Sequence, residues 1–196
     1  DAITCWFDHD NGTLATACGL AMQRSMSQFS RVQIVDGSEI ALALKISVAI
    51  GPARRFLVGD DQIQIIDVLA GETLSRMAAA GGVAKRGELV VDPQTAKSLG
   101  HCVAISEWRS DDSGVAFAIV EAMTMAVAEP ERLPQPHLTA QQVQPWLLAP
   151  VFNRLESGQG EFLTELRPAV PIFLKFSGID YDHDDDTESR RLDHST

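Results

Sequence analysis

The strongest constraint on the fold is a nine-residue alternation at residues 42–50. Its even-numbered positions are all large aliphatic residues and its odd positions are small or polar. Alternation of this kind, rich in β-branched residues, predicts a strand with one buried face. Gly51-Pro52 interrupts the pattern, and residues 54–60 are again extended in character. We therefore expect an antiparallel hairpin formed by residues 42–50 and 54–60.

Further elements follow from periodicity and capping residues. Helices are expected at residues 14–30, at 72–80 before Gly81-Gly82, after Asp92-Pro93 as far as Gly100, and at 139–156. Strands are expected at residues 2–7, 63–69, 88–91, 102–109 and 115–120, the last two as a hairpin. This order predicts an α+β fold, an antiparallel sheet with helices packed on one face.

Composition excludes several classes of partner. The chain has 196 residues, 45% of them apolar, which suffices for one domain with a core and a remainder. A formal charge of −11 argues against nucleic acid and anionic membrane as main partners. The sequence shows no membrane-spanning apolar run and no leader, and its three cysteines are odd in number and widely spaced. We expect a cytoplasmic protein with reduced thiols.

Common catalytic and metal motifs are missing from the sequence. The acidic run at residues 180–186 alternates aspartates as a calcium loop does, but Asp185 and Arg191 stand where glycine and glutamate are required. We interpret it as a solvated loop. The histidines have no paired spacing for zinc, and there is no serine nucleophile elbow or phosphate-binding glycine loop.

Several segments, taken in order, carry a family resemblance. Residues 44–59 form a strand, glycine, strand segment, residues 66–78 a strand-to-helix segment, and residues 87–92 a following strand. Together with residues 1–7, they resemble class III adenylate/guanylate cyclases over roughly residues 1–120. The resemblance implies a ferredoxin-like nucleotidyl cyclase domain over residues 1–128, without its first strand and helices.

The C-terminal part resembles a tandem arrangement. Three prolines in residues 129–136 predict a linker, which with the following helix extends over 129–165. Residues 165–176 resemble the join to a second cyclase domain in soluble, bicarbonate-responsive-type adenylyl cyclases. Lys175 or a neighbour stands where the family has a metal-binding aspartate, so residues 166–196 are expected to begin a degenerate second cyclase half.

The resemblance implies conversion of ATP, or GTP, to a cyclic nucleotide and pyrophosphate in signal transduction. Mg²⁺ or Mn²⁺ would be the cofactor and the second cyclase half of the same chain the partner. Asp1 matches a metal-binding aspartate, whose own partner would lie on the missing first strand. The fragment alone is therefore expected to be inactive. Without the resemblance, Asp1 would be interpreted as a solvent-exposed terminal residue.

Three arginines are candidates for contact with the nucleotide. Arg76 could stabilise charge on the transferring phosphoryl group. The family has asparagine four residues before this arginine, where Glu72 stands here. In a tandem enzyme this arginine would face the degenerate twin site, so the resemblance implies a regulatory small-anion site or a structural role for Arg76 more readily than a catalytic one. Without the resemblance, Arg76 would be interpreted as a surface arginine. Arg54 and Arg55 could bind the triphosphate, but neighbours on a strand point to opposite faces, so at most one would do so.

A different class of function stays open. The chain could be a catalytically inactive, cyclase-like sensor module that regulates an attached ATPase or repeat region. Glu72 and Lys175 both favour this alternative.

Overall fold

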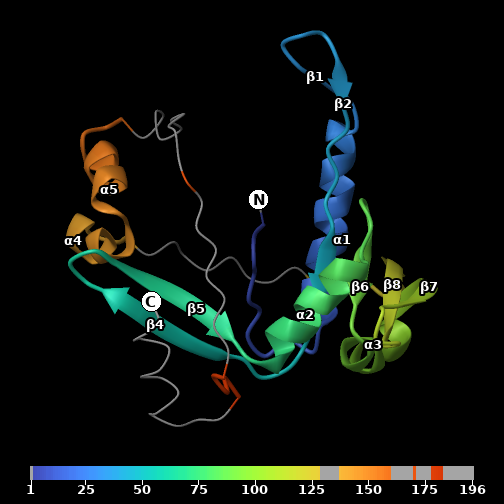
Figure 1. The fold of residues 1–196 in the computed structure, drawn as a ribbon. Coiled ribbons are helices and arrows are strands. Elements are labelled where there is room, and N and C mark those ends of the chain that lie inside the picture. Colours follow the sequence, from blue (N-terminus) through green and yellow to red (C-terminus); the bar gives the residue numbers. More distant parts are fainter. Residues whose placement is uncertain (1, 129–136, 160–169, 171–177, 183–196) are drawn as a thin grey trace. The chain divides into compact units, whose positions relative to one another are not determined.

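The computed structural model describes residues 2–128, 137–159, 170 and 178–182 (Figure 1). The chain divides into two compact units. The first unit contains residues 1–52 and 72–130, and the second contains residues 53–71 and 131–196. In the described part of the chain, no helix has the length and apolar character needed to cross a membrane.

A four-stranded sheet organises the first unit. Its strands are β3 (Ile46–Val48), β6 (Leu89–Val91), β8 (Ala116–Met123) and β7 (Val103–Ser110), in the order β3-β6-β8-β7. β3 is parallel to β6, whereas β8 is antiparallel to both β6 and β7. The α+β class is therefore confirmed, with a mixed sheet in place of a purely antiparallel one.

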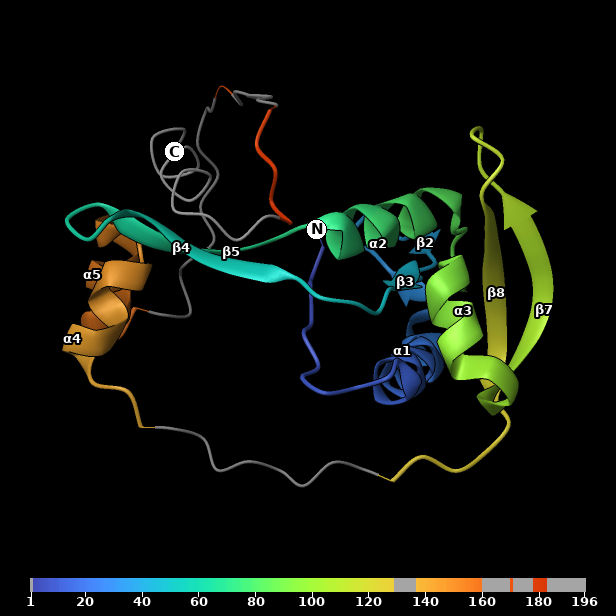
Figure 2. The same ribbon diagram turned by 90° about the horizontal axis from the view of Figure 1, so that it is seen from below.

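Helices cover both faces of this sheet. On one face, Leu89 and Val91 of β6 pack with Leu20 of α1 (Thr13–Met26) and Leu99 of α3 (Pro93–Leu99). On the other face, Val90 packs against α2 (Glu72–Val83). Figure 2 shows α1 and α2 on opposite sides of β3. The expectation of helices on one face is wrong, because the β6 residues are apolar on both sides.

A short 3-10 helix and a two-stranded hairpin follow the C-terminal end of α1. The 3-10 helix η1 (Ser27–Phe29) follows α1, and β1 (Val32–Gln33) pairs antiparallel with β2 (Glu39–Ile40). In Figure 1 this short hairpin lies at the end of α1 that is remote from α3. The chain then returns along α1 to β3.

The predicted capping of α3 is confirmed. The Asp92 carboxylate accepts hydrogen bonds from the backbone N–H groups of Gln94 and Thr95, both at 3.3 Å, and Pro93 opens the helix. The 3-10 helix η2 (Gly100–Cys102) leads on to β7. The hairpin predicted at the end of this unit is confirmed as β7 and β8.

The second unit is built on a hairpin of two seven-residue strands, β4 (Arg54–Asp60) and β5 (Gln64–Ala70). Phe56 and Val58 are buried on one face of the hairpin, where Ile179 and Tyr181 pack against them. Gln64 Nε2 donates to the Trp146 carbonyl at 3.1 Å. Trp146 belongs to η3 (Gln144–Trp146), which lies between α4 (Ala140–Val143) and α5 (Ala149–Glu156).

The predicted hairpin between residues 42–50 and 54–60 is wrong. β3 pairs with β6, and β4 pairs with β5 over its whole length. β3 is also shorter than the alternation predicts, since its described partner β6 has only three residues. The buried side of the alternation is correct, because Val48 lies in the core with Leu89 and Val91.

Other elements differ from the prediction in their length, number or existence. α2 continues through Gly81-Gly82 to Val83, so the two glycines do not close it. Residues 2–7 form no strand. The helix predicted at 139–156 is divided into three helices. Both η3 and α5 have a proline in their first turn, where the backbone N–H that proline lacks would have no partner within the helix. Residues 129–136 and 160–165 of the predicted linker and most of the second predicted domain lie outside the described residues, so the domain division stays a prediction.

Candidate functional site

One face of α2 holds the sharp corner that follows β3. Thr73 and Arg76 lie one turn apart, so their side chains share a face of the helix. Arg76 Nη2 donates to the Ile50 carbonyl at 2.7 Å, and Thr73 Oγ1 donates to the Pro52 carbonyl at 2.6 Å. Arg76 Nη2 also donates to Thr73 Oγ1 at 3.2 Å. Two side chains of α2 thus bind both carbonyls that flank Gly51.

Gly51 is required at this corner for two reasons. Its φ angle is +148°, a value that residues with a side chain rarely adopt. A Cβ atom at this position would lie 2.5 Å from Thr73 Oγ1 and 2.8 Å from Arg76 Nη2. The side chains of α2 therefore reach the backbone only because residue 51 is glycine.

A buried carboxylate completes the arrangement. Asp92 is 1% exposed, and its Oδ2 lies 2.5 Å from Arg76 Nη1. Thr95 Oγ1 donates to Asp92 Oδ1 and accepts from the Ile50 N–H at 2.9 Å. Both backbone polar groups of Ile50 are therefore bound, one by Arg76 and the other by Thr95. We call these residues the corner network; its members are Ile50, Gly51, Pro52, Thr73, Arg76, Asp92 and Thr95.

The Arg76 guanidinium is directed into the protein. Its two terminal nitrogens donate to Asp92, Ile50 and Thr73, and its Nε is buried with no hydrogen-bond partner among the described residues. The side chain is 21% exposed. A guanidinium has five N–H donors, so these internal bonds leave few for an added anion. This geometry favours the structural role of Arg76. A catalytic role of Arg76 stays a prediction.

Arg54 and Arg55 lie on opposite faces of β4, in the other compact unit. Arg54 stacks over the Phe56 ring, with 4.8 Å between its Cζ and the ring centroid. Arg55 makes a bidentate ion pair with Asp67 of β5 at 2.6–2.9 Å, and Arg55 holds the pKa of that carboxyl below its usual value. The Arg55 side chain is 66% exposed. Triphosphate binding by one of them stays a prediction.

The predicted metal ligand Asp1 lies outside the described residues, as does Lys175. Among the residues that are described, no three histidine, cysteine, aspartate or glutamate side chains are grouped so as to hold a metal ion. The described part of the chain therefore does not by itself fit a Mg²⁺ or Mn²⁺ site.

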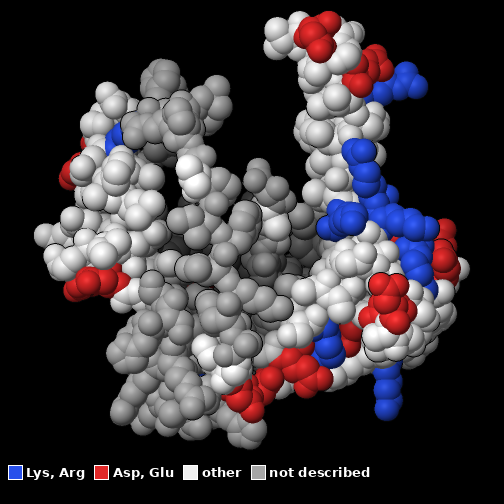
Figure 3. All heavy atoms as spheres, viewed as in Figure 1, with Lys and Arg blue, Asp and Glu red and all other residues white. Residues whose placement is uncertain are grey.

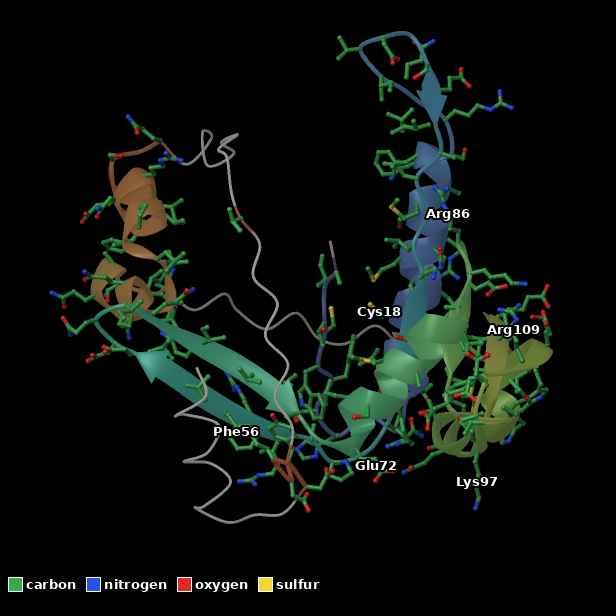
Figure 4. All side chains as sticks on the ribbon, viewed as in Figure 1. Cys18, Phe56, Glu72, Arg86, Lys97 and Arg109 are labelled. Carbon is green, nitrogen blue, oxygen red and sulfur yellow. The ribbon has the colours of Figure 1, made fainter. Side chains whose placement is uncertain are left out.

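A second ion-pair cluster lies at the opposite end of α2. Arg109 of β7 makes a bidentate pair with Glu88 at 2.8 and 3.0 Å and also contacts Glu107 and the Val83 carbonyl, both at 3.0 Å (Figure 4). The Arg109 hydrogen bonds and the Lys85 N–H lower the pKa of Glu88 to about 2. The cluster joins the end of α2 to the sheet, and every charge in it has an opposite partner.

Sequence reasoning found Asp92 only as a helix cap and did not find Thr73 or Thr95. The Asp92 prediction rested on the local Asp-Pro pattern, which says nothing of a residue on another helix. The only available signal for the Arg76 pair was an aspartate placed directly after the apolar strand residues Val90 and Val91. An ionised group at such a position needs a partner.

Comparison with solved structures finds guanylyl cyclase domains. The chain resembles them in fold. The guanylyl cyclase Cya2 is 18% identical, with a TM-score of 0.49 over 64% of this chain and 64% of that one. The guanylate cyclase domain of RhGC from Catenaria anguillulae, solved with GTP, is 14% identical, with a TM-score of 0.43 over 59% of this chain and 62% of that one.

A third similar structure has a different nucleotide. It is the catalytic core of a rhodopsin-guanylyl cyclase with converted specificity, in complex with ATPαS, at 14% identity and a TM-score of 0.42 over 58% of this chain and 60% of that one. The chain thus spans less than two thirds of the length of these cyclase structures. No protein-family model matches the sequence, and no curated protein matches it.

Proposed function

We propose that this chain is part of a nucleotidyl cyclase that converts ATP or GTP to a cyclic nucleotide and pyrophosphate. The observation that carries the proposal is the order of the segments that resemble class III cyclases, at residues 1–7, 44–59, 66–78 and 87–92. Three of these segments include β3 and β4, the junction of β5 with α2, and β6. The corner network takes residues from each of these three segments and surrounds a glycine that permits no side chain.

Cyclisation needs the ribose 3′-hydroxyl in line with the α-phosphorus and neutralisation of the triphosphate charge. Mg²⁺ or Mn²⁺ would supply that neutralisation. We propose Asp1 as the metal ligand from this chain. Arg54 or Arg55 would bind the triphosphate, and the second half of the site would come from a second cyclase domain, whose start we place at residues 166–196.

A regulatory function without catalysis is the second candidate, and the contacts of Arg76 favour it. The guanidinium makes three internal hydrogen bonds, one of them in its ion pair with Asp92, and Glu72 stands where the family has asparagine. A cyclase domain that keeps its fold but not its catalytic residues could transmit a signal to attached domains. In that case Arg76 would serve stability alone.

The test is a cyclic-nucleotide assay of the whole protein with Mn²⁺, supplied with ATP or GTP. We expect cyclic product from the wild type, and at least about a hundredfold less from Asp1→Asn, because a lost ligand costs several kcal/mol of charge stabilisation. Asp112→Asn is the matched control, since Asp112 lies in an exposed turn between β7 and β8. It should leave the rate unchanged.

Each other outcome overturns part of the proposal. If neither nucleotide gives a cyclic product, the chain is not part of an active cyclase, and the regulatory function becomes the assigned one. Wild-type activity in Asp1→Asn would show that Asp1 is not a metal ligand, while leaving the cyclase reaction in place.

A further inference from the structure

The loop that leads into α1 contains the dipeptide Asn11-Gly12, whose chemistry the proposed function does not use. Asparagine is a chemically labile residue, and a following glycine has no side chain to shield its nitrogen from the asparagine amide carbon. Asn11 is exposed to solvent. The chain has one other asparagine, Asn153, which lies within α5 and precedes Arg154. The sequence therefore contains one asparagine suited to reaction with its neighbour and one that serves as an internal reference.

Gly12 is fixed at this position by the packing of the first unit. Its φ angle is +95°, and a Cβ atom here would lie 2.9 Å from Ile50 Cγ2. Side-chain carbons of Thr95 and Leu99 would lie at 3.5 and 3.6 Å from the same atom. A residue with a side chain would be strained and crowded here, so the fold keeps glycine, the least shielded neighbour, directly after Asn11.

The hydrogen bonds around Asn11 leave the reacting groups available. The Thr13 N–H donates to Asn11 Oδ1 at 3.2 Å, and this oxygen is the atom on which negative charge develops when a nucleophile attacks Cγ. Within the described part of the chain, the Asn11 side-chain nitrogen makes no hydrogen bond and the Gly12 N–H donates none. Neither the nucleophile nor the leaving group is thus held by another residue.

We propose that Asn11 is a site of spontaneous deamidation in the folded chain, with isoaspartate among the products. The Gly12 nitrogen loses its proton to hydroxide and bonds to Asn11 Cγ, and the bond from Cγ to the side-chain nitrogen breaks. That nitrogen takes a proton from water and leaves as ammonia, so a cyclic succinimide remains. Water then adds to one of the two ring carbonyls, which gives aspartate or isoaspartate. The reaction consumes only water and does not depend on the proposed cyclase function.

The two products differ in their effect on the packing of α1. Aspartate keeps the original backbone and an oxygen for the Thr13 N–H, whereas isoaspartate routes the backbone through the side chain and lengthens it by one carbon. The Asn11 carbonyl accepts a hydrogen bond from Ser98 Oγ of α3 at 3.0 Å, and the Gly12 backbone has little space beside Ile50. Isoaspartate should therefore weaken the attachment of α1 to α3 and to the corner network, and aspartate should not.

Deamidation also adds one negative charge to a chain whose formal charge is −11. Figure 3 shows Asp and Glu at the β1–β2 hairpin and at several other places on the described surface. Ion exchange can thus separate the deamidated chain from the original one, but the new charge does not by itself reveal its position. The modified residue must be located in a peptide.

Peptide mapping by mass spectrometry, during incubation of the folded chain at neutral pH, tests the proposal. We expect Asn11 to lose its amide at least about tenfold faster than Asn153, because the Arg154 side chain and the helix around it hinder the equivalent attack. Isoaspartate should be found at position 11 by methylation with a protein isoaspartyl methyltransferase. Circular dichroism checks that the chain stays folded throughout. Equal rates at the two asparagines would overturn the proposal, as would aspartate as the only product, since direct hydrolysis does not involve Gly12.

Two matched variants test the assignment of the reacting residue. Asn11→Gln should lower the release of ammonia from position 11 at least about tenfold, since the longer side chain no longer places its carbon beside the Gly12 nitrogen. Asn153→Gln should leave the rate at Asn11 unchanged.

The consequence for packing is measured separately. The isoaspartate form should unfold at a lower urea concentration than Asn11→Asp, which has the charge of the product but the normal backbone. Equal midpoints would overturn the inferred effect on α1.

Discussion

Arg76 Nη1 lies 2.5 Å from Asp92 Oδ2, and this ion pair links helices on opposite faces of the sheet. Arg76 belongs to α2, and Asp92 caps α3 directly after β6. The pair thus crosses the end of β6, the strand whose residues pack on both helical layers. It also fixes Ile50, the last residue before the Gly51 corner. One buried contact therefore ties together two layers and a backbone turn.

Arg76→Ala should destabilise the first unit severely. Without the guanidinium, the Asp92 carboxyl at 1% exposure loses its ion-pair partner, and breaking a buried ion pair by removing one partner costs about 3–5 kcal/mol. Urea unfolding followed by circular dichroism would measure the loss. Arg55→Ala is the control, because its pair with Asp67 is exposed and should be worth about 1 kcal/mol or less. Equal effects of the two variants would contradict the assigned role of Arg76.

Gly51→Ala should be more costly than an alanine at another glycine with positive φ. The added Cβ would meet Thr73 Oγ1 at 2.5 Å and Arg76 Nη2 at 2.8 Å, so we expect a loss of about 2–4 kcal/mol from strain and displaced contacts. Gly87→Ala has a φ of +85° but open space around the new atom, so about 1 kcal/mol is expected. The difference between the unfolding midpoints of Gly51→Ala and Gly87→Ala measures the cost of the clash with α2. Similar midpoints for the two variants would show that this clash has no such cost.

Local patterns in the sequence predicted most elements but not the partner of β3. Alternation at residues 42–50 correctly indicated the buried side of the strand, because that depends on side-chain period alone. Pairing depends on which strand lies beside it in the folded chain. The short connection at residues 51–53 suggested a hairpin, yet the partner is β6, whose first residue is Leu89. Register and pairing are tertiary properties that a window of a few residues cannot contain.

The candidate site was predictable to a similar degree. Arg76 was singled out, and Asp92 was recognised as a helix cap, but their ion pair was not foreseen, since the two lie sixteen residues apart on different elements. The corner glycine was interpreted as a strand breaker, which is correct locally. Its larger role comes from the side chains that approach it, and these are set by the packing of α2.

The stability of the first unit should fall in acid as Glu88 is protonated. Its pKa is lowered from 4.5 to about 2, chiefly by the Arg109 hydrogen bonds, so it contributes stability above about pH 4.5 and loses it as pH falls toward 2. The loss should be of the order of 1 kcal/mol, because solvent partly screens the pair. Glu88→Gln should remove this contribution, so the free-energy difference from the wild type should shrink across the same pH range.

Glu107→Gln provides the control for that experiment. Glu107 contacts the same Arg109 side chain, but it is more than half exposed, so its replacement should change the free energy of unfolding by only about 0.5 kcal/mol. A difference between wild type and Glu88→Gln that is independent of pH would contradict the strong Glu88–Arg109 interaction.

Two fully buried threonines should respond oppositely to replacement by valine. Thr16 Oγ1 in α1 is buried with no hydrogen-bond partner among the described residues, so Thr16→Val should be neutral or stabilising by up to about 1 kcal/mol. Thr95 Oγ1 accepts from Ile50 and donates to Asp92, so Thr95→Val should cost about 1–3 kcal/mol. Thermal unfolding of both variants shows whether each replacement raises or lowers the stability of the protein. A loss in Thr16→Val as large as that in Thr95→Val would mean that the Thr16 hydroxyl has a partner in solution.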